Sequence, residues 1–290
     1  VNASNNDKNW AWLNAVKEGT VQIDAAHPSR RFEGGSRFTL RDLRAPSSDA
    51  DQRVDLALQG PTSKSMLLAL GGSESELRSD DKRKAEALAW ANVTRVNLGG
   101  YDLIVSRTGY TGERIAYELF VHPDQAAALF QKLIDLGAKP TGLAARDSLR
   151  TEAGLPLYGH ELGGDKGLNP ADAGFGNYVK LWKPFFVGKA AFVAHERERA
   201  AEVVRFRLEN KGARPPHPGD TLVDPNGQQV GVVTSCSIDS EGYMLGQAYV
   251  NDAANAEGTR LGVRSARAKA DAPPIPAVIL SRFPSRKKQS

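Results

Sequence analysis

A short apolar run that is closed by two glycines restricts the possible fold of this sequence more than any other feature. Leu103–Val105 has the composition of a strand, and Gly109 and Gly112 follow it closely. Glycine tolerates positive φ and lets the backbone approach another group, so the run is expected to end in a loop. Polar and apolar residues then alternate over Tyr117–Val121, which predicts a second strand. The stretch Ser106–Glu118 is therefore predicted to be a loop between two strands, where binding residues are common.

Further strands are predicted on both sides of this loop. Residues 1–4 are typical of the end of a strand, and Phe38–Leu43 and 54–58 are strand candidates. Residues 93–98 and 101–105 are predicted to form two strands that lead directly into the loop. These segments do not follow a regular strand–helix–strand repeat, so the pattern favours an α+β fold.

Helices are predicted between the strands. Asn5 or Asn6 can cap a first helix, because asparagine accepts hydrogen bonds from the free backbone N–H groups of a helical start. The charged residues 73–88 predict an exposed helix, and 192–203 predict a linking helix. The clearest helix opens at His122–Asp124, because proline suits the first helical turn, and it carries apolar residues at helical spacing from Ala126 to Ile134. Gly137 and then Pro140 are expected to stop it.

The pattern changes after residue 199. Val204–Leu208 alternates between apolar and charged residues, which is typical of a half-buried strand. Asp224–Gly227 has the composition of a hairpin turn between two apolar strands. We therefore expect two domains: residues 1–198 form the α+β domain, and residues 199–290 form an antiparallel β-sandwich or β-barrel.

Composition excludes several classes of function. The net charge of +4 is small and no basic stripe with interleaved aromatic residues is present, so no nucleic-acid partner is expected. No segment approaches the ~18 apolar residues of a membrane helix, so no membrane partner is expected. A single cysteine excludes an internal disulfide and favours a reducing compartment. No metal site is expected, because the histidines are scattered without ligand spacing: His27, His122, His160, His195 and His217.

Four residues in and after the glycine-containing loop are candidates for ligand binding. The Glu118 carboxylate can accept two parallel hydrogen bonds from a flat N–C–N edge, such as that of a pterin. Arg146 can donate a fork of two hydrogen bonds to a carboxylate or carbonyl group. Tyr110 and Tyr158 can stack on a flat ring or donate a hydroxyl. The alternative is structural: Glu118 and Arg146 form an ordinary ion pair, and both tyrosines are core residues.

Three segments in this region carry a family resemblance. They are Arg107–Glu113 (RTGYTGE), Ala144–Arg150 (AARDSLR) and Glu152–Gly159 (EAGLPLYG). In this order they resemble the aminomethyltransferase (T-protein) of the glycine cleavage system and its folate-dependent relatives. Leu58–Pro61 (LQGP) and Val187–Ala191 (VGKAA) are similar to further segments of the same family.

The resemblance implies a fold, a cofactor and a set of site residues. The family has two α/β layers around a central folate site and a small C-terminal β domain. It implies tetrahydrofolate as the acceptor of a one-carbon unit at N5, with Glu118 at the pterin edge and Arg146, Tyr110 and Asn2 in the same ligand site. The catalytic aspartate of the family would precede Val1, so we expect the chain to be a fragment or processed form that lacks the family's N-terminal part.

The resemblance also implies partners and alternatives. The expected activity is aminomethyl transfer in glycine catabolism, with a small-molecule one-carbon donor, a lipoyl-carrying H-protein as a further partner, and a cytoplasmic location (the mitochondrial matrix in a eukaryote). The loop Glu113–Glu118 is one residue longer than the usual family pattern, and Gly176–Tyr178 stands where the family often has Gly-Trp. These differences leave open a folate-dependent demethylase of methylated amines, sulfonium compounds or aryl ethers. An alternative of another class is a non-catalytic folate-binding assembly or repair protein.

Overall fold

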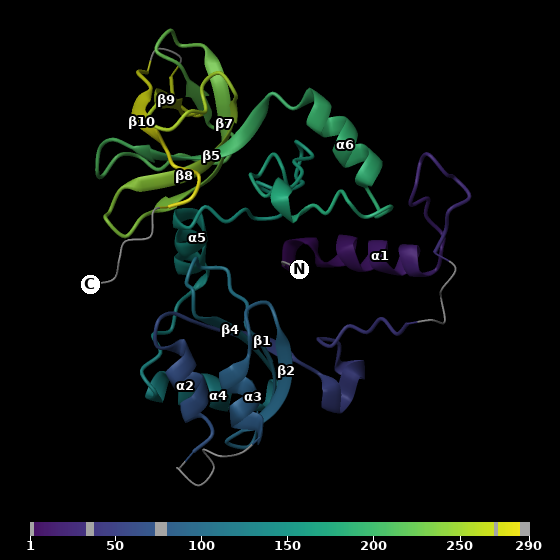
Figure 1. Cartoon of the computed structure of the whole chain (residues 1–290). Helices are drawn as coiled ribbons and strands as arrows, with labels where there is room; N and C mark the ends of the chain where they lie inside the picture. Colours follow the sequence, from purple (N-terminus) through teal and green to yellow (C-terminus); the bar gives the residue numbers. More distant parts are fainter. Residues whose placement is uncertain (1–2, 33–37, 73–79, 270–271, 285–290) are drawn as a thin grey trace. The chain divides into compact units, whose positions relative to one another are not determined.

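The computed structural model describes residues 3–32, 38–72, 80–269 and 272–284 (Figure 1). Its chain divides into two compact units, Leu40–Arg146 and Val1–Thr39 together with Asp147–Ser290. The division falls within helix α5, Leu143–Glu152. The domain boundary expected between residues 198 and 199 stays a prediction.

The unit of residues 40–146 is a two-layer α/β structure. Its antiparallel sheet has the strand order β1-β4-β3-β2. Helices α2, α3 and α4 gather beside this sheet (Figure 1). The elements of the unit are the 3-10 helix η2 (Pro46–Asp51), β1 (Val54–Gln59), α2 (Ser63–Ala69), α3 (Asp80–Ala87), β2 (Val93–Leu98), β3 (Tyr101–Ser106), β4 (Ala116–Val121) and α4 (Pro123–Asp135).

Alternation along the strands decides which face of this sheet is buried. On β4, Tyr117, Leu119 and Val121 are buried, whereas Glu118 and Phe120 between them are half-buried. The buried residues pack in one core with Leu67 of α2, Ala85 of α3 and Leu129 of α4. Since successive strand residues point to opposite faces, Glu118 lies on the face away from this core.

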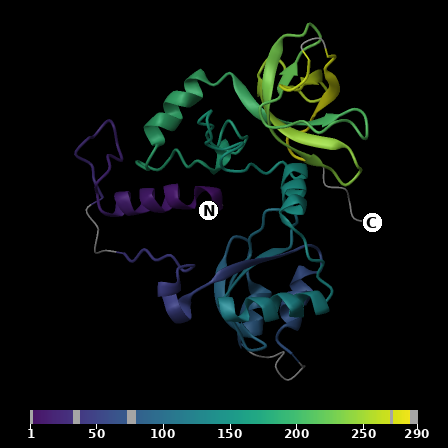
Figure 2. The ribbon, with the colours of Figure 1, turned by 180° about the vertical axis from the view of Figure 1, so that it is seen from behind.

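The second unit contains a closed antiparallel β-barrel with the strand order β10-β5-β8-β7-β6-β9 (Figure 2). The sequence predicted a β-sandwich or a β-barrel for residues 199–290, and the structure shows a barrel. Its strands are β5 (Ala201–Leu208), β6 (Thr221–Val223), β7 (Gln229–Ile238), β8 (Met244–Asn251), β9 (Arg260–Arg264) and β10 (Ile275–Leu280). The same unit holds η1 (Ala3–Asn5), α1 (Asn6–Lys17), η4 (Gly176–Tyr178) and α6 (Lys189–Glu198).

The barrel core is built around Phe206. This ring is fully buried, and Gly246 on the neighbouring strand lies directly opposite it. A Cβ at Gly246 would lie 2.5 Å from the ring, so the aromatic side chain requires a glycine there. The predicted hairpin at Asp224–Gly227 joins β6 and β7, and the Asp224 carboxylate accepts hydrogen bonds from the backbone N–H groups of Asn226 (2.9 Å) and Gln228 (2.8 Å).

Two predicted strands are wrong where the structure describes them. Phe38–Leu43 is not a strand, because Asp42 begins a turn: its carbonyl accepts from Ala45 N at 3.1 Å and its carboxylate accepts from Arg44 N at 3.0 Å. Residues 3 and 4 belong to the 3-10 helix η1, which leads into α1, and residues 1 and 2 lie outside the described part.

The predicted helices are present with shifted bounds. The helix expected over 73–88 is described as α3 from Asp80, and 73–79 lie outside the described part. The expected linking helix is α6, which begins and ends a few residues before 192–203. Among the described residues, no helix is long and apolar enough to cross a membrane.

Candidate functional site

The candidate site lies on the open face of the sheet in the unit of residues 40–146. Glu118 on β4 pairs with Ala57 on β1 and with Ser106 on β3. Cross-strand partners lie side by side on one face of a sheet. The two partners of Glu118 have small side chains, so the row leaves room for a ligand beside the carboxylate.

Two hydroxyl groups hold the Glu118 carboxylate in place. The Thr108 hydroxyl donates a hydrogen bond to Glu118 Oε2. Ser106 Oγ lies 2.8 Å from Thr108 Oγ1, and because the Thr108 proton is directed to Glu118, Ser106 is the donor in this second contact. No other hydrogen bond to the carboxylate comes from the described residues. Oε1 is therefore available to a ligand while the group keeps a defined orientation.

Gln59 anchors the loop that the glycines predict. Gln59 Oε1 accepts from Tyr110 N at 3.1 Å and from Thr111 Oγ1 at 2.7 Å. The backbone of the loop approaches so closely at Gly109 that a Cβ there would lie 2.7 Å from Gln59 Oε1 and 2.4 Å from the Ala116 Cβ. The glycine is thus required by packing against the end of β1 and the start of β4.

Tyr110 and Arg146 come together across this loop. The Arg146 guanidinium carbon lies 5.6 Å from the centre of the Tyr110 ring, within the range of a cation–π contact. Arg146 lies on the first turns of α5 and is exposed. Its donors therefore remain accessible, and the tyrosine limits the directions in which they can point. Glu118 and Arg146 form no direct ion pair in the described structure, contrary to the structural alternative.

The sequence analysis missed two residues of this site, Gln59 and Asp55. Both lie on β1, two residues before and two residues after Ala57, so they point to the same face of the sheet as Ala57 and its partner Glu118. Loss of hydration raises the pKa of Asp55 to about 6; the Glu118 carboxylate also raises it, and Arg146 lowers it. Polar residues at alternate positions of a predicted strand were a signal for both.

The other two predicted site residues, Tyr158 and Asn2, are not found beside Glu118 in the described part of residues 40–146. Tyr158 belongs to the unit that holds the barrel, where its carbonyl accepts from Asn5 Nδ2 at 3.3 Å and Lys8 Nζ lies 5.6 Å from its ring centre. Asn2 lies outside the described residues. The structure thus groups Glu118, Arg146 and Tyr110, and the roles of Tyr158 and Asn2 stay predictions.

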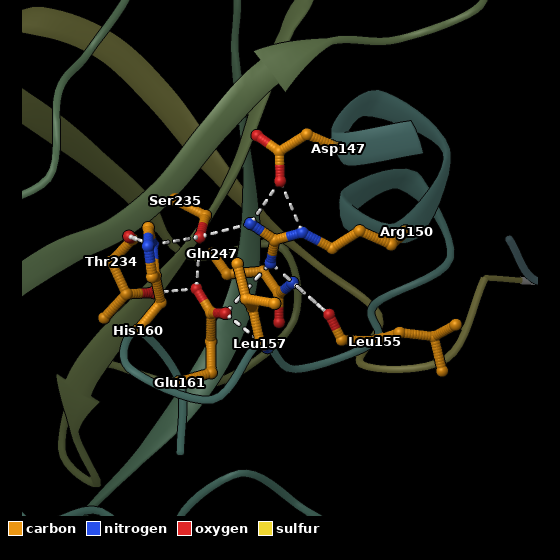
Figure 3. Close-up of polar contacts among 9 residues, drawn as sticks. All are labelled: Asp147, Arg150, Leu155, Leu157, His160, Glu161, Thr234, Ser235 and Gln247. Carbon is orange, nitrogen blue, oxygen red and sulfur yellow. Dashed lines mark hydrogen bonds and ion pairs between the residues drawn. The ribbon is translucent and has the colours of Figure 1, made fainter. Parts of the chain in front are cut away.

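A second polar cluster surrounds Arg150 in the unit that holds the barrel (Figure 3). Arg150 and Glu161 are both fully buried, and Arg150 Nη1 lies 2.9 Å from Glu161 Oε2. Arg150 also donates to Asp147 Oδ1 at 2.6 Å and to Ser235 Oγ at 2.8 Å. Glu161 Oε1 accepts from Thr234 Oγ1 and from Ser235 Oγ, both at 2.6 Å.

This cluster connects α5 and the segment after it to the barrel. Leu157 N donates to Glu161 Oε2 at 2.9 Å, and Gln247 Nε2 on β8 donates to the Leu155 carbonyl at 3.0 Å. The charges of Arg150 and Glu161 are matched within the protein and have no contact with solvent. The cluster therefore supports the fold, and Arg150, in the same motif as Arg146, has a structural role.

No group of three or more potential metal ligands is found among the described residues. In the candidate site, Asp55 and Glu118 share the sheet face, and the Arg146 guanidinium on α5 is close enough to lower the pKa of Asp55, so its charge opposes a metal cation there. The donor set suits an organic ligand that carries N–H groups and a carboxylate better than it suits a metal ion.

Comparison with known proteins gives one consistent family. The GCVT N-terminal domain matches residues 1–183. An aminomethyltransferase of Halothermothrix orenii is 33% identical over 91% of this chain and 66% of its own length, and one of Cutibacterium acnes is 38% identical over 79% of this chain and 62% of its own length. The crystal structure of the glycine cleavage system aminomethyltransferase T from Bartonella henselae matches with a TM-score of 0.65 and 30% identity, covering 79% of this chain and 59% of that one.

The matched relatives are longer than this chain. An aminomethyltransferase of Alkaliphilus oremlandii is 36% identical over 73% of this chain but only 50% of its own length. The chain thus spans about half to two thirds of the length of the curated relatives that it matches. The resemblance predicted from the loop and helix motifs is confirmed at the level of the family.

Proposed function

The chain belongs to the family of the GCVT N-terminal domain, and from this we propose that it serves a tetrahydrofolate-dependent one-carbon transfer of the aminomethyltransferase type. In this reaction a one-carbon unit passes from an aminomethyl donor to N5 of tetrahydrofolate. The observation that carries the proposal is the oriented Glu118 carboxylate on an open sheet face, flanked by small side chains, with Arg146 over the ring of Tyr110 in the adjoining loop.

Glu118 is assigned to the pterin. A reduced pterin presents an amino group and a ring N–H on one edge, and a carboxylate is the natural acceptor for such a pair. The Thr108 hydroxyl donates to one oxygen of the Glu118 carboxylate and so fixes the plane of the carboxylate. Binding of the pterin therefore requires little reorganisation of this side chain. Ala57 and Ser106 beside Glu118 leave space for the flat ring system.

Arg146 and Tyr110 are assigned to the rest of the folate and to its orientation. Folates end in carboxylates, and an exposed arginine held over a tyrosine ring can donate to such a group. Tyr110 can also cover one side of a flat ligand. Asn2 and Tyr158 are further candidates on the strength of the family resemblance and the sequence alone.

The proposed contribution of these residues to the reaction is mainly orientation. Tetrahydrofolate, when bound, supplies the N5 nitrogen that accepts the carbon. Glu118 would hold the cofactor at its pterin edge and Arg146 would supply a second contact, which converts an encounter of two molecules into a positioned pair. No catalytic acid is assigned among residues 1–290.

Partners and location follow from the same proposal. The donor is an aminomethyl group, carried by a lipoyl-bearing H-protein or by a small molecule, and the compartment is the cytoplasm or the mitochondrial matrix. The alternative activity is a folate-dependent demethylation of methylated amines, for which the longer loop Glu113–Glu118 is the supporting observation. A folate-binding assembly protein without turnover is the remaining alternative.

Calorimetric titration with tetrahydrofolate tests the proposal. Glu118→Gln keeps the shape of the side chain but removes its charge, so we expect binding to weaken by ~1.5–3 kcal/mol, or about 10- to 150-fold in Kd. Glu86→Gln makes the same change at an exposed position on α3 and is expected to leave Kd unaltered. Absence of tetrahydrofolate binding by the unchanged protein would refute the proposal.

Assays with different donors separate the alternatives. Transfer from an aminomethyl-loaded lipoyl carrier supports the glycine cleavage type, and transfer from methylamine in its place supports the demethylase. Binding of tetrahydrofolate with neither transfer supports the assembly protein. Arg146→Ala should raise Kd without lowering the melting temperature, because the side chain is exposed.

A further inference from the structure

The side-chain amide of Gln59 is held in one orientation by the loop that it anchors. Its Oε1 accepts from Tyr110 N at 3.1 Å and from Thr111 Oγ1 at 2.7 Å. The Tyr110 N–H can only donate, so an exchange of the amide oxygen and nitrogen would set two donors against each other. The two contacts therefore fix which atom of the amide is the oxygen and which is the nitrogen.

The nitrogen of the same amide is open to a ligand. Among the described residues, none accepts a hydrogen bond from Gln59 Nε2, and this atom is not one of their buried, unpartnered atoms. It therefore keeps access to solvent, although the residue as a whole is half-buried. An amide that is fixed by its oxygen and open at its nitrogen offers N–H donors in a defined place.

Gln59 and Glu118 are neighbours on the same face of the sheet. Ala57 pairs with Glu118, and Gln59, two residues further along β1, pairs with Ala116. Gln59 and Glu118 are thus diagonal neighbours, which lie about 7–8 Å apart on an antiparallel pair and within reach of long side chains. The other two positions of this square are alanines, which are too small to separate the polar groups. The face therefore presents a carboxylate acceptor and an amide donor next to each other.

The order of these two groups matches one edge of a pterin. Along that edge an exocyclic amino group and a ring N–H, which are both donors, are followed by the 4-oxo group, which is an acceptor. Glu118 is assigned to the two donors, because a carboxylate accepts hydrogen bonds and donates none. The adjacent 4-oxo group gives up its hydrogen bonds to water on binding, so it requires a donor from the protein.

We propose that Gln59 Nε2 donates a hydrogen bond to the 4-oxo group of the pterin, which makes Gln59 a specificity residue for 4-oxo over 4-amino pterins. The inference rests on the proposed function and adds to it how the site distinguishes ligands at the pterin edge. A 4-amino pterin carries N–H donors in place of the oxygen, and these oppose the N–H groups of Gln59. A site built for one hydrogen-bonding pattern rejects an analogue that leaves its polar groups unpaired.

Gln59→Glu tests this assignment, because it replaces the donor by an acceptor and keeps an oxygen for Tyr110 N and Thr111 Oγ1. Calorimetric titrations compare tetrahydrofolate with 4-amino-4-deoxytetrahydrofolate. In Gln59→Glu we expect the Kd for tetrahydrofolate to rise about 10-fold and the Kd for the 4-amino analogue to fall about 3-fold, the scale of one hydrogen bond lost or gained. Gln131→Glu adds the same charge at an exposed position on α4 and should alter neither Kd.

The two ligands separate this inference from the proposed function. Equal weakening of both ligands by Gln59→Glu assigns the effect to charge and overturns the inference, and an unchanged Kd for tetrahydrofolate overturns it as well. The unchanged protein supplies a second measurement that needs no variant: it should bind tetrahydrofolate more tightly than the analogue, and equal Kd values overturn the inference. In these cases the proposed function stands. If the unchanged protein binds no tetrahydrofolate, the proposed function fails first and the inference fails with it.

Discussion

At the scale of the residue, Asp55 links the chemistry of the candidate site to the stability of the fold. Its pKa in the folded protein is raised from 3.8 to about 6, so the folded state holds this proton more tightly than the unfolded state does. The free energy of unfolding therefore falls as the pH rises from about 4 to about 6, and the loss is complete above that range.

Asp55→Asn removes the carboxylate and with it the fall in the free energy of unfolding between about pH 4 and about pH 6. We expect the variant to be more stable than the unchanged protein at pH 7.5, by about 1 kcal/mol or less because solvent screens an exposed charge. At pH 4 the two proteins should melt at the same temperature, since Asp55 is then protonated in the folded state. Thermal melts at both pH values measure the difference; equal melting temperatures at pH 7.5 would show that Glu118 and dehydration do not disfavour the charge.

At the scale of the element, the Arg150–Glu161 cluster determines how α5 and the segment after it are attached to β7. Both charges are fully buried and each makes several hydrogen bonds. Desolvation opposes such a pair, and mutual attraction together with the surrounding hydroxyl groups offsets it. The cost of a substitution therefore depends on whether one charge is removed or both.

Arg150→Met leaves Glu161 buried without its partner, and we expect it to lower the free energy of unfolding by ~3–5 kcal/mol. Arg150→Met combined with Glu161→Met replaces both charges by apolar groups and should recover part of that loss. Urea denaturation of the two variants and the unchanged protein measures both values. If the double variant loses the sum of the two single losses, the charges do not act as a pair.

At the scale of the whole molecule, each unit has a hydrophobic core of its own. Leu119 lies in the core of the sheet and helices of residues 40–146, and Phe206 lies in the core of the barrel. Neither core contains residues from the other unit. Core substitutions are therefore expected to act first on the unit that contains them.

We expect Leu119→Ala to cost ~2–5 kcal/mol and Phe206→Ala ~3–5 kcal/mol, because each leaves a cavity. Hydrogen exchange resolved by peptide should rise in residues 40–146 for the first variant and in the barrel strands for the second. Leu13→Ala on α1 is a surface control, since Leu13 is exposed, and should change stability by less than about 0.5 kcal/mol. Equal acceleration in both units for either variant would contradict independent cores.

Local patterns in the sequence determined most of the elements. Alternation over Tyr117–Val121 predicted the strand, because neighbouring residues of a strand point to opposite sides whatever they pair with. The glycines predicted the loop of Tyr110 for a similar reason, since their backbone freedom is a property of the residue itself. The failure at Phe38–Leu43 shows the limit, because one aspartate that can bond its own backbone was enough to make a turn.

Tertiary structure alone decided how these elements meet. Pairing of β1 with β4 brings Asp55 and Gln59 to the face of Glu118, and Gln59 bonds to Tyr110 from 51 residues away. The partners of Arg150 likewise come from β7, and nothing near Arg150 in the sequence distinguishes it from Arg146 on the same helix. Strand register and burial depend on contacts between distant segments, whereas periodicity records only neighbours along the chain. The sequence by itself therefore determined the family, most of the strands and the loop, and the fold decided which polar residues share a site and which support the core.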